Sequence, residues 1–159
     1  MNNGRADSGN AGDILDLSHF FPFRLSILEK RVSESVAQYY AARFNLTRYE
    51  WRVMATLAMH RSMSAKEVAN FTGLDKMQVS RAISGLKQAE LINQSKSERD
   101  RRTSVLTLTI QGVELYNQIV PQVMAQEQKL LQVLSAEDQQ TLHRLMETLS
   151  SHAESLIED

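Results

Sequence analysis

Three helix starts follow one another closely between residues 47 and 78, and this spacing allows only short helices. Each start is a capping pair, a Ser, Thr or Asp followed three residues later by Glu or Gln: Thr47 with Glu50, Ser64 with Glu67, and Asp75 with Gln78. In such a pair, each side chain accepts a hydrogen bond from the backbone N–H of the other residue. Between the second and third starts, Gly73 can adopt the left-handed conformation that a tight turn needs. Two short helices joined by a Gly-containing turn predict a helix-turn-helix motif.

The same signals give the bounds of the expected elements. We expect short helices from Arg48 to His60, from Ser64 to about Phe71, and from Asp75 to about Ala89. Their predicted buried apolar side chains are Trp51, Met54, Ala55 and Leu57 in the first helix, and Val68, Ala69 and Phe71 in the second. β-Branched residues in 105–109 predict a strand that pairs with Leu91 and Ile92. The polar segment 93–103 between these strands forms the tip of a two-stranded wing.

Longer helices are expected on both sides of this motif. Pro22 suits the first turn of a helix, and the following apolar periodicity extends that helix to about Ala42. A second long helix runs from about Ile110 to Leu134 and is kinked or locally opened at Pro121. Both the first helix and the last one, which starts at Ser135, carry an apolar face: Phe21, Leu25, Leu28, Val32, Val36 and Tyr39 in the first, and Leu142, Leu145, Met146, Leu149 and Leu156 in the last.

The composition excludes several classes of protein. The 159 residues contain no cysteine, which excludes a disulfide scaffold, an iron–sulfur cluster, thiol-based sensing and cysteine-containing zinc sites. The four histidines show no metal-ligand spacing, and we expect neither a metal nor a cofactor. No glycine-rich phosphate loop and no nucleophile elbow is present, so we expect no enzyme. Without an apolar run of about 18 residues or a secretory leader, we expect a cytoplasmic protein.

The middle of the chain is basic although the whole chain is nearly neutral. The formal net charge is −1, but residues 60–104 hold nine Lys and Arg against five Asp and Glu. The remaining residues hold nine basic and fourteen acidic side chains. A basic segment between acidic ends is typical of a surface that faces a polyanion, although helix surfaces also segregate charge for solubility.

The helix expected over 75–89 has one apolar and one polar face. At 100° per residue, Val79, Ile83 and Leu86 fall on the buried face. The second helix of a helix-turn-helix enters the major groove of DNA. The candidate DNA contacts on and beside the opposite face are Lys76, Met77, Gln78, Ser80, Arg81, Ser84 and Lys87. Gln pairs with adenine, Arg with guanine and an apolar tip with the thymine methyl, whereas the lysines neutralise phosphates.

The tip of the predicted wing concentrates arginine. Candidate DNA contacts there are Arg99, Asp100, Arg101 and Arg102. An arginine in a narrow minor groove benefits from the negative potential there, and Asp100 can orient a neighbouring guanidinium. A helix-turn-helix can also be a protein-docking module, so the DNA interpretation depends on the groove face, the wing and the charge segregation together.

On these residues, the chain resembles the multiple-antibiotic-resistance-regulator (MarR) family of winged helix-turn-helix transcription factors. The matching segments are Leu46-Thr47 with Trp51-Arg52-Val53, Ser64 to Gly73, Asp75 to Arg81 with Leu86, and Asp100-Arg101-Arg102 leading to Leu106-Thr107-Leu108-Thr109 and Gly112. The resemblance spans about residues 20–157. It implies that Arg102 enters the minor groove and that Asp100 helps to hold it.

The resemblance also implies a fold: mainly α, a winged helix-turn-helix with a short β-hairpin wing and with N- and C-terminal dimerisation helices. A flexible tail over 1–17 then precedes a single MarR-type domain over 18–159. Within it, residues 46–109 form the DNA-binding lobe, and residues 18–45 and 110–159 form the helical dimerisation region. The apolar faces of the first and last helices support a homodimer, since they exceed what a small winged-helix core needs to cover.

Members of the MarR family commonly bind small aromatic or phenolic acids between the dimerisation helices and the lobe. The candidate effector contacts in this chain are His19, Phe23, Arg24 and Trp51. They offer a switchable donor, an aromatic wall and a guanidinium for a carboxylate. A Trp such as Trp51 is more often a core anchor, and Arg24 is equally compatible with an exposed or ion-paired position.

The sequence therefore predicts a sequence-specific regulator that binds double-stranded DNA at a pseudo-palindromic operator. A repressor released by a small aromatic or phenolic acid is favoured over an activator. The alternative is an effector-independent DNA-binding or architectural protein, which would bind every duplex with the same salt dependence.

Overall fold

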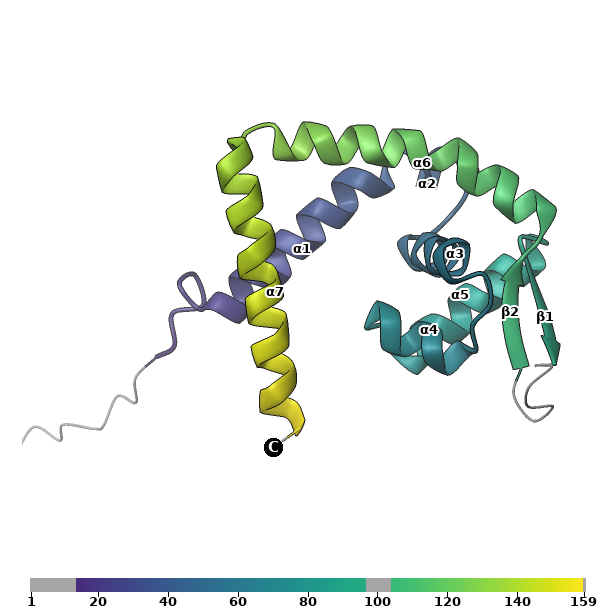
Figure 1. Ribbon diagram of the computed structural model, residues 1–159, viewed down its shortest axis with the longest axis horizontal. Helices are drawn as coiled ribbons and strands as arrows, with labels where there is room; N and C mark the ends of the chain where they lie inside the picture. The colour runs from purple at the N-terminus through teal and green to yellow at the C-terminus, as the bar shows by residue number, and fades with distance from the viewer. Residues whose placement is uncertain (1–13, 97–103, 159) are drawn as a thin grey trace, which may run out of the picture.

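The computed structural model describes residues 14–96 and 104–158, and side chains up to residue 157. Helices dominate this part of the chain, and two strands pair antiparallel (Figure 1). The elements in order are α1 (Phe21–Ala37), α2 (Ala41–Phe44), α3 (Arg48–His60), α4 (Ala65–Thr72), α5 (Lys76–Gln88), β1 (Ile92–Lys96), β2 (Ser104–Leu108), α6 (Ile110–Leu131) and α7 (Ala136–Glu158). The predicted fold class, mainly α with a winged helix-turn-helix, is confirmed.

All three predicted capping boxes are formed. At the start of α3, the Thr47 hydroxyl accepts from the backbone N–H of Glu50 at 3.2 Å, and the Glu50 carboxylate accepts from the N–H of Thr47 at 2.7 Å. The same reciprocal pairs open α4 and α5. Gly73 has a φ of 67° and ends α4, as the turn requires. These local contacts explain why α3, α4 and α5 begin where the sequence predicts.

Helices α3, α4 and α5 and strand β2 enclose the core of the lobe. Its fully buried side chains include Met54, Leu57, Val68, Leu86 and Leu106. Leu106 also exchanges two backbone hydrogen bonds with Met63, at 3.2 and 2.8 Å. This bridge between the α3–α4 loop and β2 was not predicted, and it ties the wing to the helix-turn-helix.

Several details of the lobe differ from the prediction. Trp51, Ala55 and Ala69 are only partly buried. Phe71 is 53% exposed rather than buried. It lies at the solvent side of α4, where its ring meets the edge of the His60 ring at 4.6 Å between centroids. In α5, the buried face consists of Val79, Ala82 and Leu86. The centre of this face lies between Val79 and Ala82, so Ile83 lies at its edge and is only partly buried.

The first helix is shorter than predicted. It ends at Ala37 rather than near Ala42, and a turn separates it from α2. Tyr40 in this turn is only 2% exposed, because its ring packs into the core on Trp51. Burying that ring redirects the chain, which the apolar periodicity alone does not show.

Helix α6 connects the wing with α7 and runs along the top of the molecule in Figure 1. It passes through Pro121 without interruption and ends at Leu131 rather than Leu134. Pro121 is exposed, so the carbonyl that loses its partner one turn earlier lies on the hydrated side of the helix. None of the helices in the described ranges is long and apolar enough to cross a membrane.

Helices α1 and α7 lie at the end of the molecule opposite the wing (Figure 1). Neither buries a residue in this single chain, and α7 has no extensive contact with any other element. Their exposed apolar side chains include Phe21, Leu25 and Leu28 of α1 and Leu145, Met146 and Leu149 of α7. Helices of this length are stabilised in proteins mainly by packing of an apolar face, so both faces lack a covering partner in the protomer.

Candidate nucleic-acid interface

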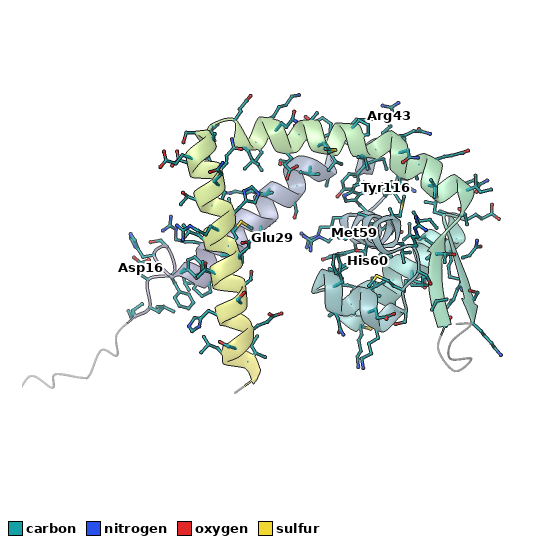
Figure 2. All side chains as sticks on the ribbon, viewed as in Figure 1. Asp16, Glu29, Arg43, Met59, His60 and Tyr116 are labelled. Carbon is teal, nitrogen blue, oxygen red and sulfur yellow. The ribbon has the colours of Figure 1, made fainter. Side chains whose placement is uncertain are left out.

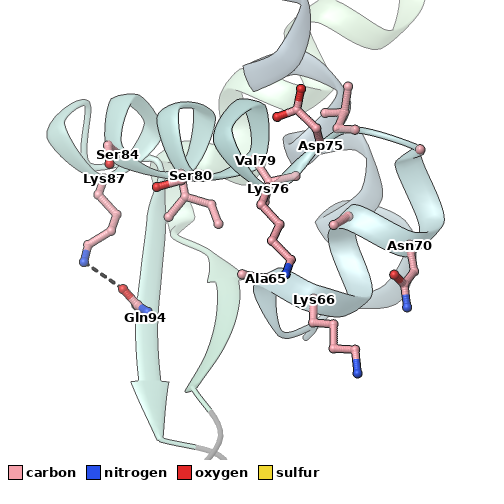
Figure 3. A pocket seen from close by; sticks show the side chains of 14 residues that line it. Ala65, Lys66, Asn70, Asp75, Lys76, Val79, Ser80, Ser84, Lys87 and Gln94 are labelled. Carbon is pink, nitrogen blue, oxygen red and sulfur yellow. Dashed lines mark hydrogen bonds between the residues drawn. The ribbon is translucent and has the colours of Figure 1, made fainter.

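A groove on the lobe lies between α4, α5 and β1 (Figure 3). Its polar lining residues are Lys66 and Asn70 of α4, Lys76, Ser80, Ser84 and Lys87 of α5, and Gln94 of β1, with Asp75 at the start of α5. Three lysines line the groove together with neutral hydrogen-bonding side chains, one carboxylate and apolar side chains such as Val79 and Ile83. This combination suits a ligand with phosphates at its edges and polar groups at its centre.

The predicted recognition face is exposed along α5. Lys76, Ser80, Ser84 and Lys87 line the groove, while Met77, 63% exposed, and Arg81 continue the exposed face beside it. The core residues on the opposite side fix the rotation of the helix about its axis. Six of the seven candidate contacts on α5 are therefore presented together to solvent.

Gln78, the seventh candidate, is only half-buried and already has protein partners. Its amide oxygen accepts from the backbone N–H of Asp75 at 3.1 Å in the capping box. Its amide nitrogen donates to the hydroxyl of Tyr49 in α3 at 3.2 Å. The side chain is thus held in a defined orientation at the start of α5.

Lys87 connects the recognition helix with the wing. Its ammonium donates to the amide oxygen of Gln94 in β1 at 2.8 Å (Figure 3). An ammonium has three N–H donors, so two remain for a phosphate. The sequence reasoning missed Lys66, Asn70 and Gln94. Lys66 and Asn70 are one helical turn apart, a spacing that puts them on one face, but no signal in the sequence pairs that face with α5.

The predicted pairing of the two wing strands is confirmed, but β1 extends to Lys96, so residues 93–96 belong to the strand and not to the tip. The register runs from Ile92 opposite Leu108 to Lys96 opposite Ser104. The candidate wing contacts Arg99, Asp100, Arg101 and Arg102 lie outside the described residues. Their predicted roles stay predictions.

Three aromatic rings stack where the lobe meets α6 and the turn after α1. The Trp51 ring lies 5.4 Å from the Tyr40 ring and 5.7 Å from the Tyr116 ring, centroid to centroid; Figure 2 labels Tyr116. Trp51 is partly buried and packs against the core. Burial raises the pKa of the Tyr40 phenol. Trp51 packs against the core at the junction where the sequence predicts an effector, and its predicted effector contact stays a prediction.

The other effector candidates lie apart from Trp51 in this chain. Phe23 and Arg24 line a shallow apolar hollow together with other residues of α1. His19 precedes α1, and its ring nitrogen bonds the carboxylate of Asp16 at 2.7 Å. Helix α1 has 17 residues and is therefore about 25 Å long. Its first turn holds Phe23 and Arg24, while Trp51 packs on Tyr40 beyond its end.

An ion cluster joins α1 to α3, and sequence reasoning missed it. The Glu29 carboxylate, on the side of α1 that faces the lobe (Figure 2), accepts from the Arg52 guanidinium at 2.7 Å and from the Ser33 hydroxyl at 2.9 Å. Arg48 lies 4.0 Å from the same carboxylate. The Ser33 hydrogen bond, followed by that of Arg52, lowers the pKa of Glu29 below its ordinary value.

This shift predicts a weak acid dependence of stability. A carboxyl whose pKa is lowered by folding stabilises the folded state above its unfolded pKa, and the contribution is lost as the pH falls through the folded value. We therefore expect Glu29→Gln to flatten the fall in melting temperature between about pH 5 and pH 3. The effect is small, because both partners are more than one-third exposed and solvent screens them. A wild-type slope in the Glu29→Gln variant would contradict the assignment.

Comparison with protein families identifies the lobe. Residues 46–104 match the model of the MarR family. Among curated relatives, FarR of Neisseria gonorrhoeae is 26% identical over 112 residues, 70% of this chain and 77% of that protein. The homoprotocatechuate degradative operon repressor of Escherichia coli is 25% identical over 138 residues, 85% of this chain and 93% of the repressor.

Solved structures share the fold over most of the chain. A MarR/EmrR family regulator from Acinetobacter sp. ADP1 has a TM-score of 0.81 at 23% identity, covering 89% of this chain and 99% of the other. Bordetella bronchiseptica BpsR, whose DNA binding is regulated by 6-hydroxynicotinic acid, has a TM-score of 0.77 at 23% identity. The match covers 86% of this chain and 97% of BpsR. A variant of E. coli MarR bound to operator DNA has a TM-score of 0.77 at 16% identity. The match covers 87% of this chain and 99% of the MarR chain. At these identities the likeness establishes the fold, and together with the family match it confirms the resemblance stated from the sequence.

Proposed function

This chain is a MarR-family DNA-binding transcriptional regulator, and from that premise we propose that it acts as a homodimeric repressor on a pseudo-palindromic operator. In this proposal, residues 46–109 form the DNA-binding lobe, and residues 18–45 and 110–159 form the dimerisation region. The exposed apolar faces of α1 and α7 support the dimer, because a second copy would cover them.

The observation that carries the proposal is the exposed face of α5 beside a groove surrounded by lysines. Met77, Ser80 and Arg81 face solvent on the recognition helix, as base-edge contacts require. Lys66, Lys76 and Lys87 stand at the edges of the groove, where phosphates of a bound duplex would lie. A dimer would present two such faces about 34 Å apart, one turn of DNA.

Fluorescence-anisotropy titration tests the proposal. The two duplexes are the DNA upstream of the chain's own gene and a shuffled duplex, in about 150 mM salt. A specific regulator prefers one sequence by about a thousandfold or more. If that duplex shows no preference, a duplex selected from a random library replaces it. Equal, weak binding to every duplex would instead support the architectural alternative.

Two substitutions on α5 separate base reading from phosphate contact. Arg81→Ala is expected to weaken operator binding by about 1–3 kcal/mol and to relax one base position, because it removes a contact to guanine. Lys87→Ala is expected to weaken binding to all duplexes equally and to reduce the salt slope by about 1. Titrations of both variants on operator and shuffled duplexes at several salt concentrations measure this. Identical behaviour of the two variants would show that the recognition face is wrongly assigned.

We propose that a small aromatic or phenolic acid releases the repressor from DNA. Trp51 at the junction of the lobe with α6 supports this proposal. BpsR, which shares the fold and whose DNA binding is regulated by 6-hydroxynicotinic acid, supports it as well. A ligand bound there stabilises a spacing of the two lobes that does not match successive major grooves. Aromatic acids are titrated into the protein–operator complex while anisotropy is recorded. If ligands bind at the junction without changing operator affinity, the protein is an effector-independent DNA binder.

That alternative has its own supporting observation. Within one chain, His19, Phe23 and Arg24 do not join Trp51 in a common pocket. The anisotropy titration with aromatic acids therefore decides between an effector-controlled repressor and a constitutive one.

A further inference from the structure

A chain of polar contacts leads from the dimerisation helix to the recognition helix. Glu29 of α1 lies 4.0 Å from Arg48, the first residue of α3. Arg48 donates to the hydroxyl of its neighbour Tyr49 at 2.8 Å. The same hydroxyl accepts from the Gln78 amide at 3.2 Å, and Gln78 caps α5 through two hydrogen bonds with Asp75. A single phenol oxygen thus receives donors from α3 and from the recognition helix.

We propose that Tyr49 is a positioning residue for DNA recognition, which fixes the side chain of Gln78 and with it the first turn of α5. The inference deepens the proposed function and rests on it. Tyr49 does not itself belong to the exposed DNA-facing surface. It acts through Gln78, which sequence reasoning assigned to base reading.

The hydrogen-bonding capacity of Gln78 supports this role. Its amide has two N–H donors and an oxygen with two lone pairs. Tyr49 and Asp75 use one donor and one lone pair. One donor and one acceptor remain, which is the set that pairs with the adenine edge in the major groove. The bonds to Tyr49 and Asp75 limit rotation of the amide group. The remaining N–H and the remaining lone pair are therefore presented in one orientation.

The surroundings of Tyr49 hold its hydroxyl in place. The ring is partly buried and packs against the core of the lobe. The Arg48 guanidinium carbon lies 4.8 Å from the centre of that ring, and the Glu29 carboxylate lies 4.0 Å from the same guanidinium. Because core packing fixes the ring and Arg48 occupies one side of the oxygen, the remaining lone pair is available to Gln78.

The test uses Tyr49→Phe in the full-length protein, with Tyr116→Phe as the matched control. Both changes remove one phenol oxygen and keep the ring, but Tyr116 in α6 lies outside this chain of contacts. We expect Tyr49→Phe to weaken binding to an operator selected by the wild type about fivefold, the usual net effect of one hydrogen bond. Binding to a shuffled duplex stays unchanged, and the adenine preference at one operator position relaxes. Tyr116→Phe changes neither affinity.

A double-mutant cycle shows whether the effect passes through Gln78. Tyr49→Phe is expected to have no effect on operator affinity in the Gln78→Ala background. Equal fivefold losses in both backgrounds, an unchanged operator affinity, or equal losses on operator and shuffled duplexes would each overturn the proposal.

Amide hydrogen exchange separates failure of this proposal from failure of the proposed function, because it needs no DNA. If Tyr49 anchors Gln78, the Asp75 amide, which donates to the Gln78 side chain, exchanges about fivefold faster in Tyr49→Phe than in the wild type. An unchanged exchange rate overturns the anchoring. If the wild type prefers no duplex, the proposed function is wrong. The positioning role for DNA recognition is then wrong as well, even if the Asp75 amide exchanges faster in Tyr49→Phe.

Discussion

Leu149→Glu is expected to dissociate the proposed homodimer. Leu149 is 48% exposed in the single chain and lies on the apolar face of α7. In a dimer this face is covered, so the substitution removes about 2 kcal/mol of apolar burial and introduces a carboxylate that must be desolvated. Because the change occurs in both subunits, about 4 kcal/mol or more is lost, and the dissociation constant rises about a thousandfold. Sedimentation-velocity ultracentrifugation over a concentration series measures it.

Ser151→Glu is the matched control, because it adds the same carboxylate on the opposite face of α7. It is expected to leave the dimer intact. If Leu149→Glu still sediments as a dimer, the apolar face of α7 is not the interface. A monomeric Leu149→Glu variant also loses operator affinity, since one lobe alone contacts half of the site.

Gly112→Ala is expected to destabilise the protein by about 2 kcal/mol. A Cβ at Gly112 in the first turn of α6 would collide with the backbone carbonyl oxygen of Leu91. That carbonyl cannot move away easily, because it accepts a hydrogen bond from the backbone N–H of Thr109 at 3.0 Å. Overpacking against a fixed atom costs about 3 kcal/mol, and the better helix propensity of Ala offsets about 1 kcal/mol.

Urea denaturation monitored by circular dichroism measures the change, with Gln111→Ala as control. Gln111 is the exposed neighbour of Gly112 in the same turn, and its substitution by Ala is expected to change stability by less than about 0.5 kcal/mol. Equal stability of Gly112→Ala and the wild type would mean that α6 moves away from Leu91 at little cost.

Features set by contacts within a few residues could be predicted from the sequence. The starts of α3, α4 and α5 follow from capping pairs three residues apart, and the polar face of α5 follows from its periodicity. Errors arose where tertiary packing decides. Phe71 occupies a position whose exposure depends on where α4 meets α3, and the end of α1 depends on the burial of the Tyr40 ring.

The sequence predicts which residues of a single helix belong to the candidate site, but not the contacts between different elements. The exposed residues of α5 were found because one helix determines them. The Glu29–Arg52 pair and the bond of Tyr49 with Gln78 join residues 23 and 29 positions apart. Gln94 meets Lys87 across the turn between α5 and β1, seven positions away. One sequence contains no periodicity that pairs such positions. The same reason explains why the sequence groups Arg24 with Trp51, although the length of α1 separates them in the protomer.

The stacking of Trp51 between Tyr40 and Tyr116 gives the molecule a built-in optical reporter. Trp51 is the one tryptophan of the chain, and its two neighbours come from the turn after α1 and from α6. Indole emission responds in wavelength and intensity to changes in ring contacts and hydration. Any rotation of α3 against these two segments, whether caused by DNA, by an effector or by loss of the partner subunit, is therefore recorded in the intrinsic fluorescence of the unlabelled protein.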